Sequence, residues 1–314
     1  MARSSSSPVA APGTAIDAVP GRSLALDLVR SLRPAQWTKN LVVFAGLLFG
    51  RKLAEPAAVL DALAAFAVFC LLSGAVYLVN DLADRESDRQ HPLKARRPIA
   101  SGALPARAAA AAALALVAAA LAAAWPIGDR FFAVAIAYLG LQLLYSGPLK
   151  HIMIIDVLTI AIGFVLRAAA GAIAVQVEIS HWLLVCTILL ALFLGLAKRR
   201  QEIVLLAAAA SNHRPILGEY SAYLLDQMIG VVTASTLIAY VFYTISPETQ
   251  AKFGTPWLGL TIPFPLYGIF RYLYLVHQRD GGGSPADLLL TDRPLLICVA
   301  LWALAVALII YRPL

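Results

Sequence analysis

Residues 80–98, with the sequence NDLADRESDRQHPLKARRP, directly follow an apolar run that extends from residue 59 to residue 79. If the helix of that run continues, Asp81, Asp84 and Asp88 fall at positions i, i+3 and i+7 and share one face. Three like charges on one stripe repel each other unless a divalent cation lies between them. Mg²⁺ is the hard cation that prefers oxygen ligands. The stretch therefore predicts a magnesium site made by the three aspartates.

Basic residues follow these aspartates closely, at Lys94, Arg96 and Arg97. Ammonium and guanidinium groups form strong charge-assisted hydrogen bonds with phosphate oxygens. We therefore expect them to bind phosphates that such a metal would carry. The alternative is an ordinary hydrated loop of mixed charges. The regular carboxylate spacing at the end of a long apolar segment favours the metal site.

The composition is that of a polytopic membrane protein. Of the 314 residues, 61% are hydrophobic and 14% are charged, whereas about a quarter of the residues of a soluble protein are charged. Cys70, Cys186 and Cys298 each lie in an apolar segment, so we interpret them as core residues rather than disulfide or metal-binding pairs. The net charge of +7 follows from membrane topology, and no nucleic-acid partner is expected.

The predicted organisation is an N-terminal tail followed by a single all-α transmembrane domain. Residues 1–23 are rich in Ser, Ala, Pro and Gly and are predicted to be disordered, and residues 24–314 form the domain. Residues 24–32 suggest a short amphipathic helix on the membrane surface. A bilayer requires about 20 residues per helix. Nine spans are predicted, the first through residues 41–50 and the others near 59–80, 106–124, 130–146, 152–175, 182–197, 226–245, 257–276 (kinked at Pro263 and Pro265) and 294–311.

The distribution of basic residues predicts the orientation of these spans. Nineteen of the 25 Lys and Arg residues fall on the side of the N-terminus, five fall on the other side, and Arg167 lies within the fifth span. By the positive-inside rule, the N-terminus is cytoplasmic and the C-terminus is outside. The clusters that can carry chemistry all fall on the cytoplasmic side.

A second cluster lies between the fourth and fifth spans and contains Tyr145, Lys150 and His151, followed by Asp156. Arg167 comes eleven residues after Asp156, about three helical turns, so the two share one face of the fifth span. An ionisable residue in hydrocarbon is costly and usually faces a cavity or a partner. The alternatives are a structural ion pair for Arg167 and a positive-inside anchor for Lys150.

The third cluster is Lys198-Arg199-Arg200-Gln201-Glu202 at the end of the sixth span. Lys198 and Glu202 are at i and i+4 and could simply pair, as in a common stop-transfer pattern. Three cytoplasmic helix ends nevertheless present complementary groups, carboxylates on one and cations on the others. Together they predict a pocket for a Mg²⁺-bound pyrophosphate.

Several motifs resemble one family of membrane enzymes. The pattern Asn-Asp-x-x-Asp-x-x-x-Asp at residues 80–88 resembles the first aspartate motif of the UbiA superfamily of intramembrane prenyltransferases. Arg-Pro-x-Gln-Trp-x-Lys-Asn at 33–40, His-Pro-x-Lys-x-x-Arg-Pro at 91–98 and Tyr-Ser-x-x-Leu-Lys-His at 145–151 resemble its decaprenyl-phosphate phosphoribosyltransferase branch. The likeness extends from about residue 30 to residue 311.

The resemblance implies nine transmembrane helices around a central cavity that opens to the cytoplasm and laterally to lipid, in the plasma membrane. It implies transfer of 5-phosphoribose from phosphoribosyl pyrophosphate (PRPP) to a polyprenyl phosphate such as decaprenyl phosphate. Pyrophosphate is released, and the product feeds synthesis of cell-wall arabinan. Typical prenyltransferases of the superfamily carry a second Asp-x-x-x-Asp motif for a second Mg²⁺, but this chain has only Asp156 there.

Roles for the candidate residues follow from this resemblance. Asn80 would assist Asp81, Asp84 and Asp88 in holding Mg²⁺ against the pyrophosphate of PRPP. The other substrate-binding candidates, which would divide between the ribose 5-phosphate and the acceptor phosphate or line the pocket, are Lys39, Lys94, Arg97, Tyr145, Lys150, Asp156, Arg167, Lys198, Arg199 and Glu202.

Three other functions stay open at this point: an aromatic or quinone prenyltransferase, a transporter, and a purely structural scaffold. Against a transporter, the charged residues gather at one membrane face and few lie at mid-depth. A scaffold leaves the aspartate stripe unexplained. The sequence does not decide whether the protein forms a homo-oligomer or how long the acceptor lipid is.

Overall fold

The computed structural model describes residues 23–90, 94–178, 180–207, 219–279 and 285–311. Within these ranges every regular element is a helix. The predicted tail lies outside the described residues, apart from Ser23 at its end. The all-α prediction is therefore confirmed for the part of the chain that the structure describes.

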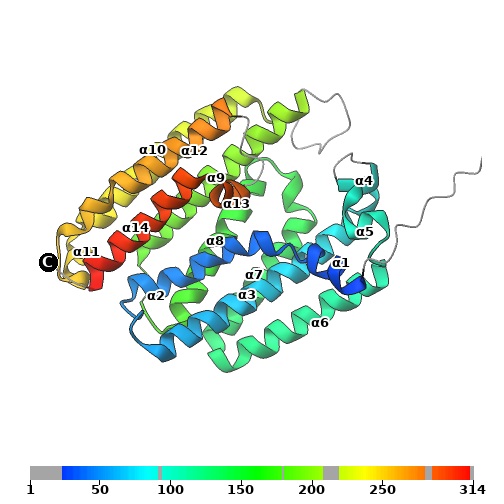
Figure 1. The fold of residues 1–314 in the computed structure, drawn as a ribbon, viewed down its shortest axis with the longest axis horizontal. Coiled ribbons are helices and arrows are strands. Elements are labelled where there is room, and N and C mark those ends of the chain that lie inside the picture. The colour runs from blue at the N-terminus through cyan, green and yellow to red at the C-terminus, as the bar shows by residue number, and fades with distance from the viewer. Residues whose placement is uncertain (1–22, 91–93, 179, 208–218, 280–284, 312–314) are drawn as a thin grey trace, which may run out of the picture.

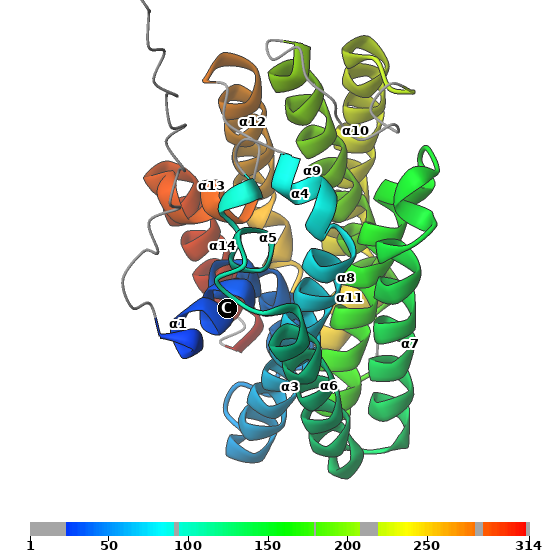
Figure 2. The ribbon, with the colours of Figure 1, turned by 90° about the vertical axis from the view of Figure 1, so that its right-hand side faces the viewer.

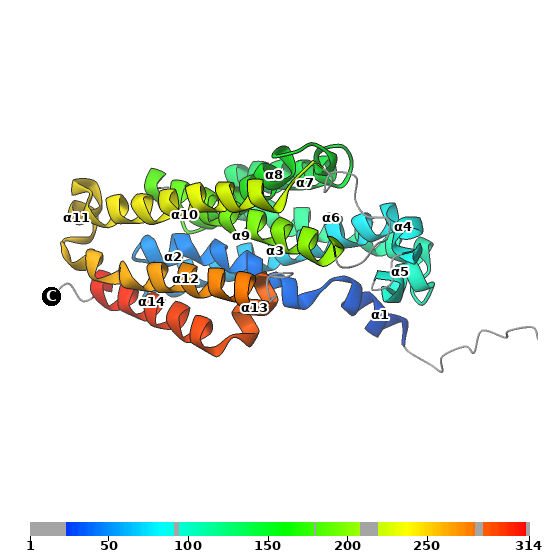
Figure 3. The ribbon, with the colours of Figure 1, turned by 90° about the horizontal axis from the view of Figure 1, so that it is seen from above.

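Long helices run side by side along the length of the molecule (Figures 1, 2 and 3). They are α3 (Pro56–Ala83), α6 (Ala106–Ala124), α7 (Asp129–Ser146), α8 (Ile155–Ala174), α9 (His181–Ala207), α10 (Ala222–Ile245), α12 (Pro263–Gln278) and α14 (Arg293–Tyr311). Short α-helices connect or flank them: α1 (Leu24–Ser31), α2 (Ala45–Phe49), α4 (Arg85–Gln90), α5 (Pro98–Ser101), α11 (Pro247–Phe253) and α13 (Pro285–Thr291). The 3₁₀ helices are η1 (Pro34–Phe44), η2 (Lys94–Arg96), η3 (Trp125–Ile127), η4 (Leu149–His151) and η6 (Trp257–Thr261).

Six helical segments of the described chain are long and apolar enough to cross a membrane: Pro56–Ala83, Ala106–Ile127, Ile155–Ala174, His181–Val204, Ala222–Ile245 and Arg293–Tyr311. The chain is thus an integral membrane protein. The other three predicted spans are occupied by η1 with α2, by α7, and by η6 with α12. These segments do not meet both criteria of length and apolarity, so the count of nine spans stays a prediction.

Two predicted local features differ in the structure. The segment through residues 34–49, predicted to contain the first span, is a 3₁₀ helix that begins at Pro34, followed by one short α-helical turn. Pro263 and Pro265 do not kink a helix; they stand in the first turn of α12, after the separate η6. Proline lacks the N–H that a helix interior needs, so the α-helix begins there instead of continuing through.

The helices pack around two main cores. The first joins α3, α7 and α8 around Phe69, Phe131 and Tyr138. The second joins α8, α9, α10 and α12 around Phe193 and Tyr272, whose rings meet edge to face. Helix α8 contributes to both and therefore lies between the two halves of the bundle.

Close backbone contact holds η1 against α8. A Cβ atom at Gly171 of α8 would overlap the carbonyl oxygen of Val43, so only glycine permits this approach. Small residues are the usual means by which membrane helices approach one another. The contact places Asn40 of η1 next to Arg167 of α8.

The two ends of the bundle differ in content. Helices α1, α4 and α5 gather at one end, and α11 lies at the other together with the end of α14 (Figures 1 and 3). The aspartates of residues 81–88 lie at the α4–α5 end, which we call the aspartate end.

Candidate active site

The first aspartate lies in the last turn of α3, but the helix does not continue as predicted. It ends at Ala83, Asp84 caps it, and α4 starts separately at Arg85. The three carboxylates therefore do not form one helical stripe. The prediction of a shared helix face was wrong because α3 ends among the aspartates.

Arginines bring two of the carboxylates together in spite of this break. Nη1 of Arg97 lies 3.0 Å from Oδ1 of Asp81 and 2.6 Å from Oδ2 of Asp88. Arg33 also donates to Asp81, and its guanidinium stacks over the ring of Tyr77. Arg33 has φ of 53°, a left-handed conformation that turns the chain between α1 and η1. Asp81 and Asp88 thus converge on a shared guanidinium while both stay buried.

The remaining aspartate binds across the molecule. Nζ of Lys150, in η4, donates to Oδ1 of Asp84 over 2.8 Å, and Lys150 is buried. Nζ of Lys94 lies 4.0 Å from Asp88. The structure therefore joins the first and second sequence clusters at the aspartate end, as predicted. Arg96 and His151 are exposed.

The donor set suits a magnesium ion, although the arrangement is not a preformed metal site. Among the described residues, no three acidic, histidine or cysteine side chains converge on one point. Basic side chains hold the carboxylates instead. However, Oδ1 of Asn80 is buried and has no hydrogen-bond partner among the described residues. This unpaired amide oxygen, next in sequence to Asp81, and the three carboxylates are hard oxygen donors of the kind that Mg²⁺ requires.

The site has two halves: the first contains the aspartates of residues 81–88 with Arg33, Lys94 and Arg97, and the second contains Asp156 of α8 with Arg199, Glu202, Tyr145 and Tyr220. Asp156 is held differently from the aspartates of the first half. Its side chain is completely buried, and Nε of Arg199 donates to Oδ2 over 2.7 Å while Tyr220 donates to Oδ1 over 2.9 Å. Arg199 also donates to Glu202 over 2.5 Å and to the hydroxyl of Tyr145 over 3.2 Å. Every charged group of this network is hydrogen-bonded within the protein, so we interpret the network as structural.

Tyr220 completes the network from outside the membrane-spanning segments. Its hydroxyl accepts a hydrogen bond from the backbone N–H of Ile154, a β-branched residue at φ of 70°. Such a conformation is costly without external support. Burial raises the pKa of Tyr220 to about 12, so the hydroxyl keeps its proton and donates to Asp156 at neutral pH.

Arg167 lies deep in the bundle, and the ion pair considered from the sequence is not formed. Its Nε donates to Oδ1 of Asn40 over 2.7 Å and its Nη2 to the hydroxyl of Tyr138 over 2.6 Å. The guanidinium also lies over the ring of Phe164. No carboxylate among the described residues pairs with Arg167. Lys39, in η1, is close enough for Arg167 and Arg33 to act on its charge.

Two residues of the third cluster, Lys198 and Arg199, make different contacts. Nζ of Lys198 lies 3.9 Å from Glu202, which is the simple i, i+4 pair considered from the sequence. Arg199 faces Asp156 inside the bundle.

Two residues of the site, Arg33 and Tyr220, were not predicted from the sequence. Arg33 belongs to a motif that had been noted, but Tyr220 stands 64 residues from Asp156 and carries no local signal.

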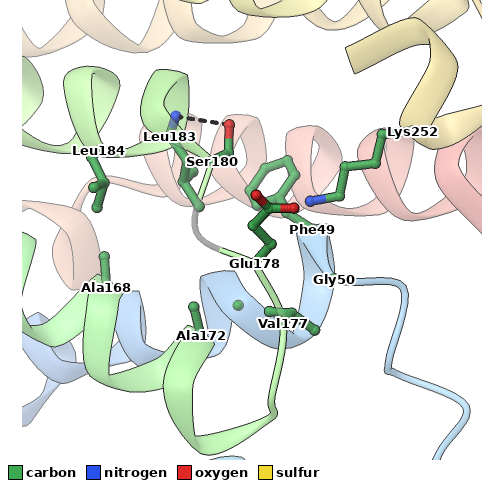
Figure 4. Close-up of a pocket in the computed structure, with 11 residues that line it drawn as sticks. Phe49, Gly50, Ala168, Ala172, Val177, Glu178, Ser180, Leu183, Leu184 and Lys252 are labelled. Atoms are coloured by element: carbon green, nitrogen blue, oxygen red, sulfur yellow. Dashed lines mark hydrogen bonds between the residues drawn. The ribbon is translucent and has the colours of Figure 1, made fainter. Parts of the chain in front are cut away.

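Two cavities lie away from these residues. One, of about 10 Å³, is at the end opposite the aspartates, between α2, α8 and α9. Figure 4 shows the Lys252 ammonium pointing toward the carboxylate of Glu178 there. Burial lowers the pKa of Lys252, and the Glu178 carboxylate acts in the opposite direction. The cavity has room for about one water molecule. The other cavity lies between α10 and α12.

Comparison with known proteins places these features in a family. Residues 40–288 match the model of the UbiA prenyltransferase family. The chain is 33% identical to decaprenyl-phosphate phosphoribosyltransferase of Corynebacterium glutamicum, covering 93% of this chain and 89% of that protein. It is 32% identical to the enzyme of the same name from Mycobacterium tuberculosis, covering 90% and 94%.

A likeness in fold accompanies the likeness in sequence. A UbiA homologue from Archaeoglobus fulgidus, solved with GPP and Mg²⁺, superposes with a TM-score of 0.70 at 21% identity, covering 90% of this chain and 99% of that one. The family match covers most of the chain, and both relatives match over nearly their full length. The chain therefore belongs to the UbiA prenyltransferase family of membrane transferases.

Proposed function

We propose that this protein transfers 5-phosphoribose from PRPP to a polyprenyl phosphate, such as decaprenyl phosphate, and releases pyrophosphate. The names of its relatives, at 32–33% identity over at least nine-tenths of the chain, support this choice within the family. The structural observation that supports the proposal is that both carboxylate oxygens of Asp156 already accept hydrogen bonds, one from Arg199 and one from Tyr220.

This observation bears on the choice of donor. A prenyl diphosphate held by two Mg²⁺ ions needs available carboxylates on both halves of the site. Asp156 has no exposed surface and both its oxygens are bonded. PRPP carries an additional 5-phosphate, and direct cations bind such a group well. The second half offers cations rather than free carboxylates, which supports PRPP.

The residues of the first half would bind the leaving group. Asn80, Asp81, Asp84 and Asp88 would hold Mg²⁺, which when bound would neutralise charge that develops on the departing pyrophosphate. Arg97 and Lys94 already lie against these carboxylates and would turn to the pyrophosphate oxygens. Lys150 would in the same way leave Asp84 for a phosphate of the donor.

The transfer itself needs no strong general base. The bond between the anomeric carbon and the pyrophosphate oxygen breaks, and an oxygen of the lipid phosphate forms the new bond to that carbon. A lipid phosphate is ionised near neutral pH, so no proton has to be removed. Lys39 and Arg167, which lie deeper in the bundle without a salt-bridge partner among the described residues, would face the acceptor. The buried network of Arg199, Tyr145 and Glu202 would hold α8 and α9 in place beside them.

The membrane arrangement is part of the proposal. We infer a single domain of nine spans in the plasma membrane, with the aspartate end in the cytoplasm, where PRPP is available. Cysteines introduced at Ser87, at the aspartate end, and at Glu248, at the other end, test the orientation in a background without native cysteines. An impermeant thiol reagent on intact cells should label only the Glu248→Cys variant. Labelling of only the Ser87→Cys variant would reverse the topology.

A transfer assay tests the reaction. Purified protein in lipid is given PRPP labelled in the ribose, Mg²⁺ and decaprenyl phosphate, and label is followed into the lipid extract. In parallel it is given GPP, which the Archaeoglobus homologue binds, with an aromatic acceptor. We expect transfer from PRPP only. Transfer of the prenyl group with no use of PRPP would instead favour an aromatic prenyltransferase.

A further inference from the structure

The cavity between α10 and α12 has a volume of about 450 Å³ and is not part of the site described above. It runs as a groove from Asp226 to Leu237 along α10, eleven residues or about 16 Å of helix. Phe270 and Leu273 of α12 form the facing wall. The walls are apolar over most of this length, and Gly230 leaves open space in the middle, because a Cβ there would meet nothing within 4 Å.

The groove has a charged head at the aspartate end. Asp226 accepts from the guanidinium of Arg200, over 2.5 Å from Nε to Oδ1 and over 3.4 Å from Nη2 to Oδ2. Both ring nitrogens of His277 face oxygen acceptors: Nδ1 lies 2.9 Å from the Leu273 carbonyl and Nε2 lies 3.2 Å from Asp226. The Arg200 guanidinium and the His277 ring therefore both face the Asp226 carboxylate at the head of the groove.

A polar group also lies inside the groove. Thr233 is only 8% exposed, and its hydroxyl has no hydrogen-bond partner among the described residues. By contrast, the hydroxyl of Thr236 on the same helix bonds the carbonyl four residues earlier. Buried hydroxyl groups are normally hydrogen-bonded. Thr233 follows Asp226 by seven residues, about 10 Å along the helix.

We propose that this groove binds a membrane glycerophospholipid, with its phosphate against Arg200 and His277 and one acyl chain along the groove. The Arg200 guanidinium can bind a phosphate, the walls match a hydrocarbon chain, and the unpaired Thr233 hydroxyl can donate to an ester carbonyl inside the groove. A polyprenyl phosphate has no acceptor at that depth, since its tail is hydrocarbon only. The site is thus distinct from that of the acceptor substrate and does not depend on the proposed donor.

The position of the site gives the lipid a structural effect. Arg199 and Arg200 are adjacent on α9, and they point to opposite sides. Arg199 holds Asp156 inside the bundle, and Arg200 holds Asp226 at the groove. A lipid phosphate on Arg200 would therefore fix the same turn of α9 that positions Arg199.

Native mass spectrometry of the delipidated, folded protein with added palmitoyl-oleoyl phosphatidylglycerol tests this site. Gly230→Leu fills the groove, and Gly140→Leu on α7 is the matched control, because a Cβ at that helical glycine also meets nothing within 4 Å. We expect Gly230→Leu to reduce the occupancy of the tightest-bound lipid at least tenfold and Gly140→Leu to leave it unchanged. Equal occupancy in both variants, or equal loss in both, would overturn the proposal.

Variants of the head give a second readout that does not depend on filling the groove. Arg200→Gln should weaken phosphatidylglycerol binding about tenfold, since a charge-assisted hydrogen bond is lost. Asp226→Asn should strengthen it, because the competing carboxylate is removed. No change in either variant would refute the assigned head. Displacement of the bound phospholipid by an equimolar amount of decaprenyl phosphate would assign the groove to the acceptor lipid instead.

Discussion

The acidic residues of the two halves of the bundle are held in different ways. The side chains of Asp81 and Asp88 are only 3% and 4% exposed, but their partners Arg97 and Lys94 are 27% and 33% exposed. Asp156 binds Arg199, and these two side chains are 0% and 3% exposed. The cations of the first set are therefore accessible to water and ligands, whereas both members of the second pair are buried.

This difference separates a binding site from a structural support. An ion pair whose cation is partly exposed is screened by water and contributes less to stability than a fully buried pair. A buried pair is different, because removing one partner leaves an uncompensated charge in a medium of low polarity. We therefore expect mutations in the first half to change activity and mutations in the second half to change stability.

The largest effect is expected at Asp84. Asp84→Asn keeps the shape of the side chain but removes a charge from the proposed magnesium site. Several kcal/mol of transition-state stabilisation would be lost, so the transfer rate should fall at least about a thousandfold. Thermal unfolding should change less than in Asp156→Ala, because the Asn oxygen still accepts a hydrogen bond from the buried Lys150. Near-normal transfer by Asp84→Asn at ordinary Mg²⁺ concentration would end the metal-site assignment.

Asp156→Ala should have the opposite profile. The guanidinium of Arg199 stays buried and keeps only Glu202 and the Tyr145 hydroxyl, so the free energy of unfolding should fall by about 3 kcal/mol. Glu86→Ala is the control, because Glu86 pairs with Arg89 on the surface and should cost well under about 1 kcal/mol. Denaturation of the purified variants measures both. Equal stability of Asp156→Ala and Glu86→Ala would show that the Asp156–Arg199 pair does not stabilise the fold.

Lys150→Ala sharpens the comparison, since this residue connects the two halves. It should weaken PRPP binding by about tenfold to a hundredfold, the value of one charge-assisted hydrogen bond. Free pyrophosphate should be affected far less if Lys150 binds the 5-phosphate. His151→Ala is the neighbouring control, and because His151 is exposed it should bind PRPP normally. If Lys150→Ala weakened the binding of PRPP and of pyrophosphate equally, Lys150 would be assigned to the pyrophosphate group instead of the 5-phosphate.

Tyr220→Phe should have the smallest effect, because only one hydroxyl is removed. Loss of its bonds to Asp156 and Ile154 should cost about 1–2 kcal/mol of stability. The pKa of about 12 in the folded protein exceeds the ordinary value near 10. The contribution is therefore complete below about pH 10 and declines as the pH rises to about 12. Thermal unfolding at pH 6 and pH 9 should give the same difference from wild type, and a difference that changes between them would contradict this.

The features that were predictable from the sequence are those with a local signal. The apolar run before Asp81 predicted the end of a long helix, and opposite charges on separate helix ends predicted that Lys150 would lie with the aspartates. The break at Asp84 was not predictable, because a turn among charged residues has the same composition as a continuing helix. The bond from Tyr220 to Asp156 joins residues far apart in sequence, so only the packed structure shows it.

Equilibrium binding of PRPP and of GPP to the purified protein, in Mg²⁺ and in EDTA, tests the central claim most directly. We predict that PRPP binds in Mg²⁺, that EDTA or Asp84→Asn removes this binding, and that GPP binds at least about a hundredfold more weakly, the value of roughly 2.7 kcal/mol. Binding of GPP as tight as that of PRPP, or PRPP binding unchanged in EDTA, would contradict a phosphoribosyl donor held by the first-half aspartates.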